Sequence, residues 1–402
     1  KYVCSKCNNI KAALGSKLPI PKGLPLEGLL SKVILDKFGM GMPFYRQSQD
    51  WGYGGINYSR QQLNGWFERV AYLVRPLVEL MYSNMLKSDY LACDETELLL
   101  LNKEDINDGA RGKDGKVYMC VMKESGKVFN FVYCWPVKSR KQEEISKKLN
   151  GFKGFFQSDG LNFYYEIQAK EGVIKVNCWA HVRRKFVDIA LLTVPDVEGD
   201  AEEGIAFEMI KMIDKLYRIE KEGKDLPVKE LLKMRKNKSA KILKEIKLYL
   251  KKYQTSVLPK SRLGIAIKYT LDRWEGLSTY LKDARIEIDN NSTERCIKYF
   301  VIGRKNWLFA SNLASAENSG ILYSLVMTCK INNINLKEYF EYIFKQLPYI
   351  NKSDVERLEQ LLPDRYDKNK GFDEEYREKR GIEEKIIINH ELSKRLGYLQ
   401  AA

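Results

Sequence analysis

The hydrophobic positions of this chain change their period along the sequence, which separates helical from sheet-forming stretches. Between residues 26 and 87 they recur at helical spacing, interrupted by the glycines at positions 52, 54 and 55. Between residues 90 and 178, short apolar runs bounded by turn residues predict strands. Helical spacing returns from residue 205 onward. The pattern therefore predicts an α/β protein with helical stretches before and after its strands.

The central stretch is predicted to form a mixed sheet with helices packed against it. Strands are predicted over residues 90–101, 116–123, 127–135, 152–158 and 174–178, and short helices over residues 141–149 and 161–167. The second and third strands are joined by a Glu-Ser-Gly turn, which favours a hairpin.

Two aspartates occupy informative positions in this sheet. Asp94 lies inside the first strand, where a charge is costly unless it is paired or bound to a metal. Asp159 follows the end of the fourth strand. Ligands commonly gather where strands of open sheets end. The two side chains would meet if these strands are neighbours.

Residues 286–309 join a turn rich in Asp and Asn to a helix and then to a basic segment that ends in aromatic residues. Short polar side chains favour a helix start, so the helix is expected to begin near Ser292. Glu294 would then lie beside an apolar stripe. Two interpretations are open: Glu294 forms a capping box with Asn291, or it belongs to a functional site.

Composition points to a folded protein that meets polyanions. The chain has 402 residues, a formal net charge of +15 and eight cysteines. A surplus of Lys and Arg attracts nucleic acids, although solvated lysine faces produce the same balance. The scattered cysteines do not form a disulfide framework. Without a long apolar run or a signal-peptide pattern, we expect a cytoplasmic protein that contacts no membrane.

Two cysteine motifs raise the question of zinc. Cys4 and Cys7 form a C-x-x-C pair, which could supply half of a tetrahedral Zn²⁺ site. Cys178 and His181 form a C-x-x-H pair without evident further ligands. We therefore expect His181 to pack or to line a site rather than to hold zinc.

The N-terminal helical region has the outline of a DNA-reading motif. A helix, a glycine-rich turn and a second helix starting after Ser59 would present Arg60, Gln61 and Asn64 away from the apolar stripe. This is what a helix-turn-helix looks like. Helix pairs of this kind are also common in proteins that do not bind DNA.

Five short motifs occur in one order between about residues 4 and 347. They are DET at 94–96, DG at 159–160, CWAHVRRKF at 178–186, DNNSTER at 289–295 and GRKNWLF at 303–309. In this combination the chain resembles the bacterial transposases of the insertion-sequence-66 family. The family usually carries a fuller N-terminal cysteine cluster, of which only Cys4 and Cys7 are present here.

The resemblance implies a ribonuclease H-like fold in which Asp94, Asp159 and Glu294 are the DDE set. These acids would hold Mg²⁺ or Mn²⁺ for the cleavage of element ends and for strand transfer, because phosphoryl transfer depends on positioning and charge neutralisation. Two other classes stay open: a DNA-binding descendant without catalysis, and a nuclease or resolvase without strand transfer. A carbohydrate hydrolase using paired carboxylates is a distant third.

DNA, as element ends and as target, is the expected partner, in a complex that contains more than one copy of the chain and small accessory proteins of the same element. The expected location is the bacterial cytoplasm, in association with the nucleoid. Besides the three residues near residue 60, the candidate DNA contacts are Arg183, Arg184, Lys185, Arg295, Arg304, Lys305 and Asn306.

The predicted organisation has seven parts. They are a partial zinc-finger-like segment and linker (1–25), a helix-turn-helix-like region (26–87), the first part of the ribonuclease H-like core (88–193), a helical insertion (194–283), the second part of the core with the Glu294 helix (284–310), C-terminal helices (311–350) and a charged tail (351–402).

Overall fold

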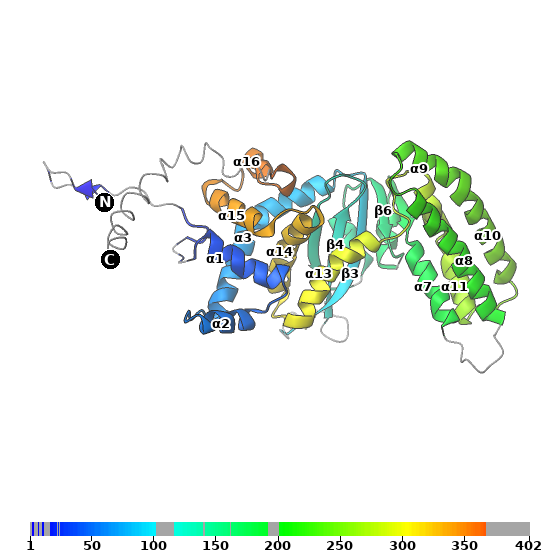
Figure 1. Cartoon of the computed structure of the whole chain (residues 1–402), viewed down its shortest axis with the longest axis horizontal. Coiled ribbons are helices and arrows are strands. Elements are labelled where there is room, and N and C mark those ends of the chain that lie inside the picture. The colour runs from blue at the N-terminus through cyan, green and yellow to red at the C-terminus, as the bar shows by residue number, and fades with distance from the viewer. Residues whose placement is uncertain are drawn as a thin grey trace, which may run out of the picture.

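A mixed sheet lies between two groups of helices (Figure 1). The computed structural model describes residues 2–3, 7, 10–11, 17–21, 23, 25–101, 116–139, 141–160, 162–191 and 201–366. The α/β class and the mixed sheet expected from the sequence are confirmed. Within these ranges, no helix combines the length and the apolar character that a membrane span requires.

The sheet has the order β5-β4-β3-β6-β7. Its strands are β3 (Tyr90–Leu100), β4 (Lys116–Glu124), β5 (Val132–Val137), β6 (Gly154–Ser158) and β7 (Val173–Asn177). The β4 strand runs antiparallel to both β3 and β5, whereas β6 and β7 run parallel to β3. A short strand, β8 (Phe309–Ala310), pairs with the far end of β3.

The predicted strands are confirmed with one shift. The third strand was expected from residue 127, but β5 begins at Val132. Residues 127–130 form a turn instead, because the Asn130 side chain accepts a hydrogen bond from the Lys127 N–H and donates one to the Lys127 carbonyl. Local side-chain bonding of this kind competes with strand pairing.

Helices from both ends of the chain cover one part of the sheet. They are α1 (Glu27–Ile34) with η1 (Leu35–Gly39), α2 (Phe44–Tyr53), α3 (Arg60–Met85), α14 (Leu313–Ile331), α15 (Leu336–Gln346) with η5 (Leu347–Tyr349), and α16 (Val355–Gln360) with η6 (Pro363–Arg365). Their apolar faces and the sheet share one hydrophobic core. Near the N-terminus, β1 (Tyr2–Val3) pairs with β2 (Ile10–Lys11).

The second group of helices lies at the other end of the sheet, beyond β7 (Figure 1). It contains α7 (Trp179–Ala190), α8 (Ala201–Glu222), α9 (Val228–Met234), η3 (Arg235–Ser239), α10 (Ala240–Gln254), α11 (Arg262–Asp272), α12 (Trp274–Ser278) and η4 (Thr279–Leu281). A separate core cluster fills it, with Trp179, Ile213 and Ile246 fully buried. We call α8 to α11 the insertion helices.

Three shorter elements and one long helix complete the fold. They are α5 (Gln142–Lys148), η2 (Asn162–Tyr164), α6 (Tyr165–Gln168) and α13 (Asn291–Trp307). The α13 helix begins one residue before the predicted Ser292 and continues through the basic segment to Trp307. It packs on β3 and β4.

Hydroxyl groups of α14 accept hydrogen bonds from the backbone N–H groups of the edge strand β5. The Cys134 N–H donates to Ser324 Oγ at 2.8 Å, and the Val132 N–H donates to Thr328 Oγ1 at 2.9 Å. Both hydroxyl residues are fully buried. An edge strand otherwise presents unpaired backbone groups. These two bonds therefore fix α14 on the sheet while they satisfy its edge.

Replacing both hydroxyls, as Ser324→Ala with Thr328→Val, should lower the free energy of unfolding by roughly 2 kcal/mol or more, because each buried N–H left unpaired costs about 1–3 kcal/mol. Urea denaturation of the whole chain measures this. Ser319→Ala is the matched control, because Ser319 lies on the same helix and bonds only to the Ser315 carbonyl. An equal loss in both variants would contradict the role given to the edge bonds.

Candidate active site

The parallel pairing of β3 with β6 brings Asp94 and Asp159 together. The register aligns Ala92 with Gln157. Asp94 and Asp159 each lie two residues beyond that pair on their own segments. Side chains two residues apart along a strand point to the same face. The two side chains therefore lie on the same face where β6 ends, and the charge of Asp159 raises the pKa of Asp94.

The start of α13 is tied to the same part of β3. The Asn290 side chain donates to the Cys93 carbonyl at 3.1 Å, and the Asn290 N–H donates to Cys178 Sγ at 3.2 Å. Asn290 is fully buried. Because Cys93 precedes Asp94, these bonds place the first turn of α13, with Glu294, beside the aspartates.

The capping-box interpretation of Glu294 is wrong. Asn290, rather than Asn291, occupies the N-cap position, so Glu294 lies one residue too late to reach back to the cap. The Glu294 N–H donates to the Asn290 carbonyl as an ordinary helical residue. Its buried Oε1 atom has no hydrogen-bond partner among the described residues.

The three acids share one electrostatic environment. The pKa of Asp94 is raised to about 8, chiefly by burial and also by the negative charges of Glu95, Asp159 and Glu294, against the lowering effect of a bond from the Glu95 N–H. A carboxyl group held mostly protonated at neutral pH by its neighbours indicates a site that lacks positive charge. A bound cation would supply that charge.

His181 faces Glu294 from α7. The His181 Nδ1 and Glu294 Oε1 atoms are 3.9 Å apart, and neither has a hydrogen-bond partner in the described part of the chain. Burial lowers the pKa of His181, Asp159 and Glu294 oppose this, and Arg184 and Lys185 add to it. His181 is therefore neutral near pH 7, and its side chain lies next to Glu294.

Two sets of side chains at this place could hold a metal. Asp94, Asp159 and Glu294 offer hard carboxylate oxygens, which suit Mg²⁺ and Mn²⁺. The donor atoms of Cys178, His181 and Glu294 also lie within 4.8 Å of one another. Burial raises the pKa of the Cys178 thiol to about 12. The carboxylate set needs no thiolate in a buried position, but among the described residues its three carboxylates are not a group whose donor atoms all lie within 4.8 Å of one another.

Residues of the insertion helices and of the segment that follows them form hydrogen bonds to the backbone just after β6. The Tyr269 hydroxyl donates to the Asp159 carbonyl at 2.6 Å, and Arg273 Nε donates to the Gly160 carbonyl at 3.0 Å. Gly160 has φ +82°, and a Cβ there would lie 2.6 Å from Arg273 Nε. Tyr269 and Arg273 were not expected from the sequence, because nothing local marks them as partners of a residue more than one hundred positions away.

Comparison with known proteins identifies the family of this chain. Residues 22–318 match the family described as Transposase IS66 family, and residues 324–363 match the IS66 C-terminal element. The chain belongs to the IS66 transposase family. The resemblance read from the five motifs is therefore confirmed at the level of the family.

Relatives within the IS66 family carry no described activity. Three uncharacterized proteins of Sinorhizobium fredii (strain NBRC 101917 / NGR234) are similar to this chain. The y4hP protein is 28% identical over 90% of this chain and 66% of its own length. The y4jD protein is 27% identical over 90% of this chain and 70% of its own length. The y4qI protein is 28% identical over 83% of this chain and 62% of its own length. The chain thus spans about two thirds of their length. No solved structure matches it.

The basic residues of α7 lie in different settings. Arg183 is paired with Asp214 on α8 at 2.8 Å. Lys185 lies over the ring of Tyr269, with Nζ 4.4 Å from the ring centre. Arg184 is exposed. Of the three predicted phosphate contacts on this helix, Arg184 is the one most available to a ligand.

Of the predicted DNA contacts on α13, two form hydrogen bonds within the chain and two are exposed. Arg304 donates to Thr96 Oγ1 at 2.9 Å and to the Glu97 carbonyl, which ties the helix to β3. Asn306 accepts a bond from Arg46 on α2 at 3.2 Å. Arg295 and Lys305 are exposed. Arg304 and Asn306 therefore form hydrogen bonds within the chain, whereas Arg295 and Lys305 are exposed to solvent.

The candidates near the N-terminus lie apart from the acids. Arg60 and Gln61 are exposed in the first turn of α3, which Ser59 and Gln62 close with a capping box, and the Asn64 side chain donates to Glu68 at 2.8 Å. Cys7 is exposed, and Cys4 lies outside the described residues. A role for the cysteine pair in zinc binding stays a prediction.

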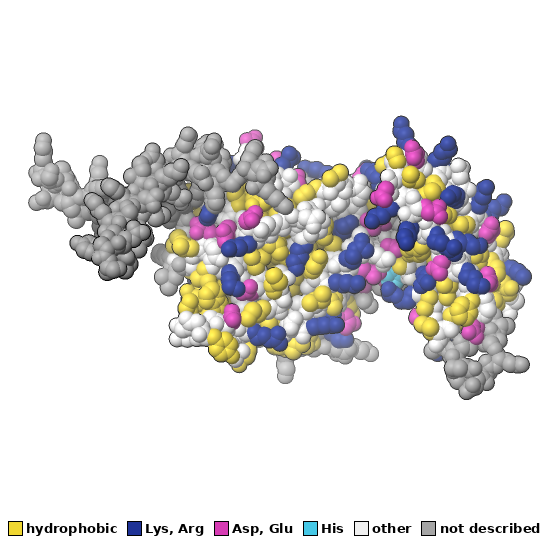
Figure 2. All heavy atoms as spheres, in the orientation of Figure 1, with side chains coloured by type: hydrophobic (Ala, Val, Ile, Leu, Met, Phe, Trp, Pro, Cys, Tyr) yellow, Lys and Arg dark blue, Asp and Glu magenta, His cyan; other side chains and the backbone are white. Residues whose placement is uncertain are grey.

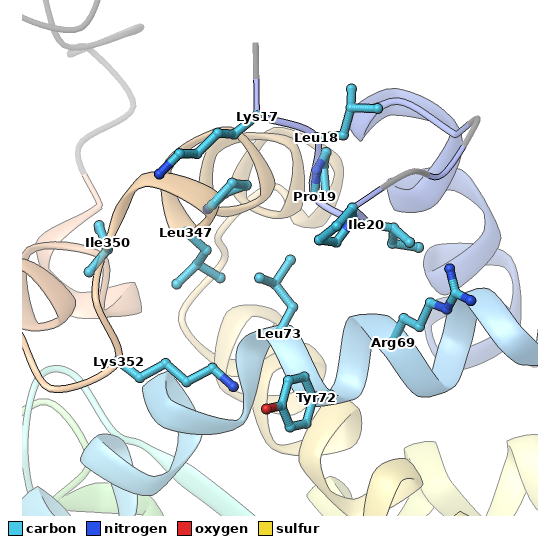
Figure 3. Close-up of a pocket in the computed structure, with 12 residues that line it drawn as sticks. Lys17, Leu18, Pro19, Ile20, Arg69, Tyr72, Leu73, Leu347, Ile350 and Lys352 are labelled. Carbon is cyan, nitrogen blue, oxygen red and sulfur yellow. The ribbon is translucent and has the colours of Figure 1, made fainter. Parts of the chain in front are cut away.

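A cavity of about 750 Å³ lies away from the acids, between residues 17–21, α3 and the segment after α15 (Figure 3). Apolar side chains such as Ile20, Leu73 and Leu347 line it, and Arg69 and Lys352 stand at its sides. None of the acids contributes to this cavity. It is therefore separate from the candidate active site.

Because the pKa of Asp94 is raised in the folded chain, we expect the stability of the chain to depend on pH. The pKa of Asp94 is about 8 when folded, against 3.8 for an ordinary aspartate. Between these values the folded chain retains a proton that the unfolded chain has released, so stability falls as pH rises. Asp94→Asn should therefore raise the Tm in EDTA more at about pH 8 than at about pH 5.

Asp188→Asn is the control for this measurement, because Asp188 is exposed on α7. Its effect on the Tm should be the same at both pH values. Added Mg²⁺ should raise the Tm of the unmodified chain and leave that of Asp94→Asn unchanged. A pH-independent gain in Asp94→Asn would contradict the electrostatic account.

Proposed function

We propose that this chain is a DDE transposase that cleaves the ends of an insertion sequence and joins them to target DNA, using divalent metal ions. The observation that carries the proposal is that Asp159, at the end of β6, and Glu294, on α13, lie near enough to Asp94 on β3 for their charges to raise its pKa. Membership of the IS66 transposase family supports it independently.

The order of the strands also supports the proposal. An antiparallel trio, β5-β4-β3, continues into two parallel strands, β6 and β7. This is the arrangement implied by a ribonuclease H-like fold, with one acid on its central strand and another at the end of the neighbouring parallel strand. We assign the core of the chain to that fold on these grounds.

The proposed roles follow from the positions of the side chains. Asp94, Asp159 and Glu294 would hold the metal, and Asp94 would release its proton when it becomes a ligand. The bound ions would activate the attacking oxygen and stabilise the leaving one. His181, which is neutral near pH 7, can accept a hydrogen bond from water or from a DNA hydroxyl beside Glu294. Arg184 would contact a backbone phosphate nearby.

Asp94→Asn, Asp159→Asn and Glu294→Gln should each lower cleavage of labelled element ends by roughly a hundredfold to a thousandfold, the usual cost of losing one charge-stabilising group. The assay contains Mg²⁺ or Mn²⁺ and separates cleaved from joined products. Glu287→Gln is the matched control, because Glu287 precedes α13 and its carboxylate lies 3.8 Å from Lys123 Nζ rather than with the acids.

The products distinguish the alternatives. Cleavage without joining would indicate a nuclease or resolvase. Binding of end DNA without any metal-dependent cleavage would indicate a DNA-binding descendant. Full cleavage by Asp94→Asn or Asp159→Asn would overturn the assignment of the acids.

Two neighbouring arginines give a sharp test of phosphate contact. Arg184→Gln should reduce the slope of log affinity against log salt by about 0.9, the loss of one phosphate contact. Arg183→Gln should leave the slope nearly unchanged, because Arg183 is already paired with Asp214. Fluorescence anisotropy with end DNA over a range of KCl measures both. Equal changes in the two variants would contradict this distinction.

A further inference from the structure

Most of the net positive charge of the chain arises in one short stretch. Residues 228–262 contain ten lysines and two arginines against two glutamates, a net charge of +10 out of +15 for the whole chain. This stretch forms α9, η3, α10 and the start of α11. None of the DNA contacts considered so far lies in it.

One face of α10 carries much of this charge outward. Lys241, Lys244, Lys251 and Lys252 are all exposed. At 3.6 residues per turn, these four positions fall within about a third of the circumference of the helix. We call them the α10 lysine face. Figure 2 shows Lys and Arg side chains gathered over this group of helices.

The α10 lysine face is not neutralised within the molecule. Glu245 is the only acidic residue of α10. The ion pairs of this stretch use other residues, Arg235 with Glu220 and Lys238 with Glu222. In the described part of the chain, none of the four lysines makes an ion pair. Like charges this close repel one another, so the face favours a polyanion.

The opposite face of α10 excludes a membrane as the preferred partner. Leu243, Ile246 and Leu250 are buried in the core of the insertion helices. An interfacial helix needs a free apolar face to enter a lipid surface. On its exposed side this helix offers mainly charge, with the 61% exposed Leu248 as a single large apolar side chain among the lysines, and charge is what binds a phosphate backbone.

The basic stretch is fixed to the candidate active site at both ends. Before α10, the buried Arg235 donates to the carbonyls of Tyr280, at 2.9 Å, and Asp283, at 3.0 Å, shortly before the segment that leads into α13. After it, α11 packs against α10 and holds Asp159 and Gly160 through Tyr269 and Arg273. A partner bound to α10 is thus held at a set position relative to the acids.

We propose that the α10 lysine face binds the phosphate backbone of duplex DNA outside the active site and thereby sets the position of that duplex relative to the acids. DNA is named as the polyanion because of the proposed function, so this inference rests on that function. The α10 lysine face would be a second DNA-contacting surface, on the insertion helices, and it would contact phosphates without distinguishing base sequences.

The test replaces all four lysines by Gln in the full chain. Binding to a duplex of about 30 base pairs of arbitrary sequence is measured by anisotropy in EDTA over a range of KCl. The slope of log affinity against log salt should fall by about three to four, and the affinity at about 0.1 M KCl should fall roughly tenfold or more. The control replaces the exposed Lys141, Lys147, Lys153 and Lys337, which changes the net charge equally.

Equal slopes in the two quadruple variants would overturn the proposal, as would an unchanged slope in the α10 variant. Binding to vesicles with about one third phosphatidylserine is measured in parallel. If the α10 variant lost vesicle binding and kept DNA binding, the surface would serve a membrane, and the proposal would also fail. Because EDTA prevents metal-dependent cleavage, the result is independent of whether the chain is a working transposase.

Discussion

The pairing of β3 with β6 is the constraint on which the rest of the site depends. Three aligned residue pairs fix the register, and Asp94 and Asp159 follow two positions later. A shift of one residue would turn one of the two side chains to the opposite face of the sheet. The bonds that hold β6 and α13 in place therefore matter as much for the chemistry as the acids themselves.

Bringing these carboxylates together opposes folding, and the structure offsets this cost with contacts to the backbone rather than to the acids. Asn290 binds the Cys93 carbonyl, Tyr269 binds the Asp159 carbonyl, and Arg273 binds the Gly160 carbonyl. None of these bonds neutralises a carboxylate. The pKa of Asp94 accordingly stays high.

The insertion helices connect the site with the most basic surface of the chain. They have a core of their own, yet Arg235, Tyr269 and Arg273 attach them to the segments that carry the acids. The helices of the N- and C-terminal regions instead share the core of the sheet. The α13 helix joins the two sides, with Glu294 near one end and Asn306 bound to Arg46 near the other.

Local periodicity was enough to predict the strands and most helices, and motifs whose letters lie close together were enough to identify the family. The same motifs suggested the three acids, whose roles stay a prediction. Even the start of α13 was predicted within one residue.

Only the tertiary structure decided how these parts act. It showed that Glu294 faces His181 instead of capping its helix, and that Arg183 and Arg304 are held by partners within the chain. It also revealed that Tyr269 and Arg273 support the end of β6. Each of these facts depends on contacts between residues far apart in the chain, and no local pattern of hydrophobic and polar positions encodes such contacts.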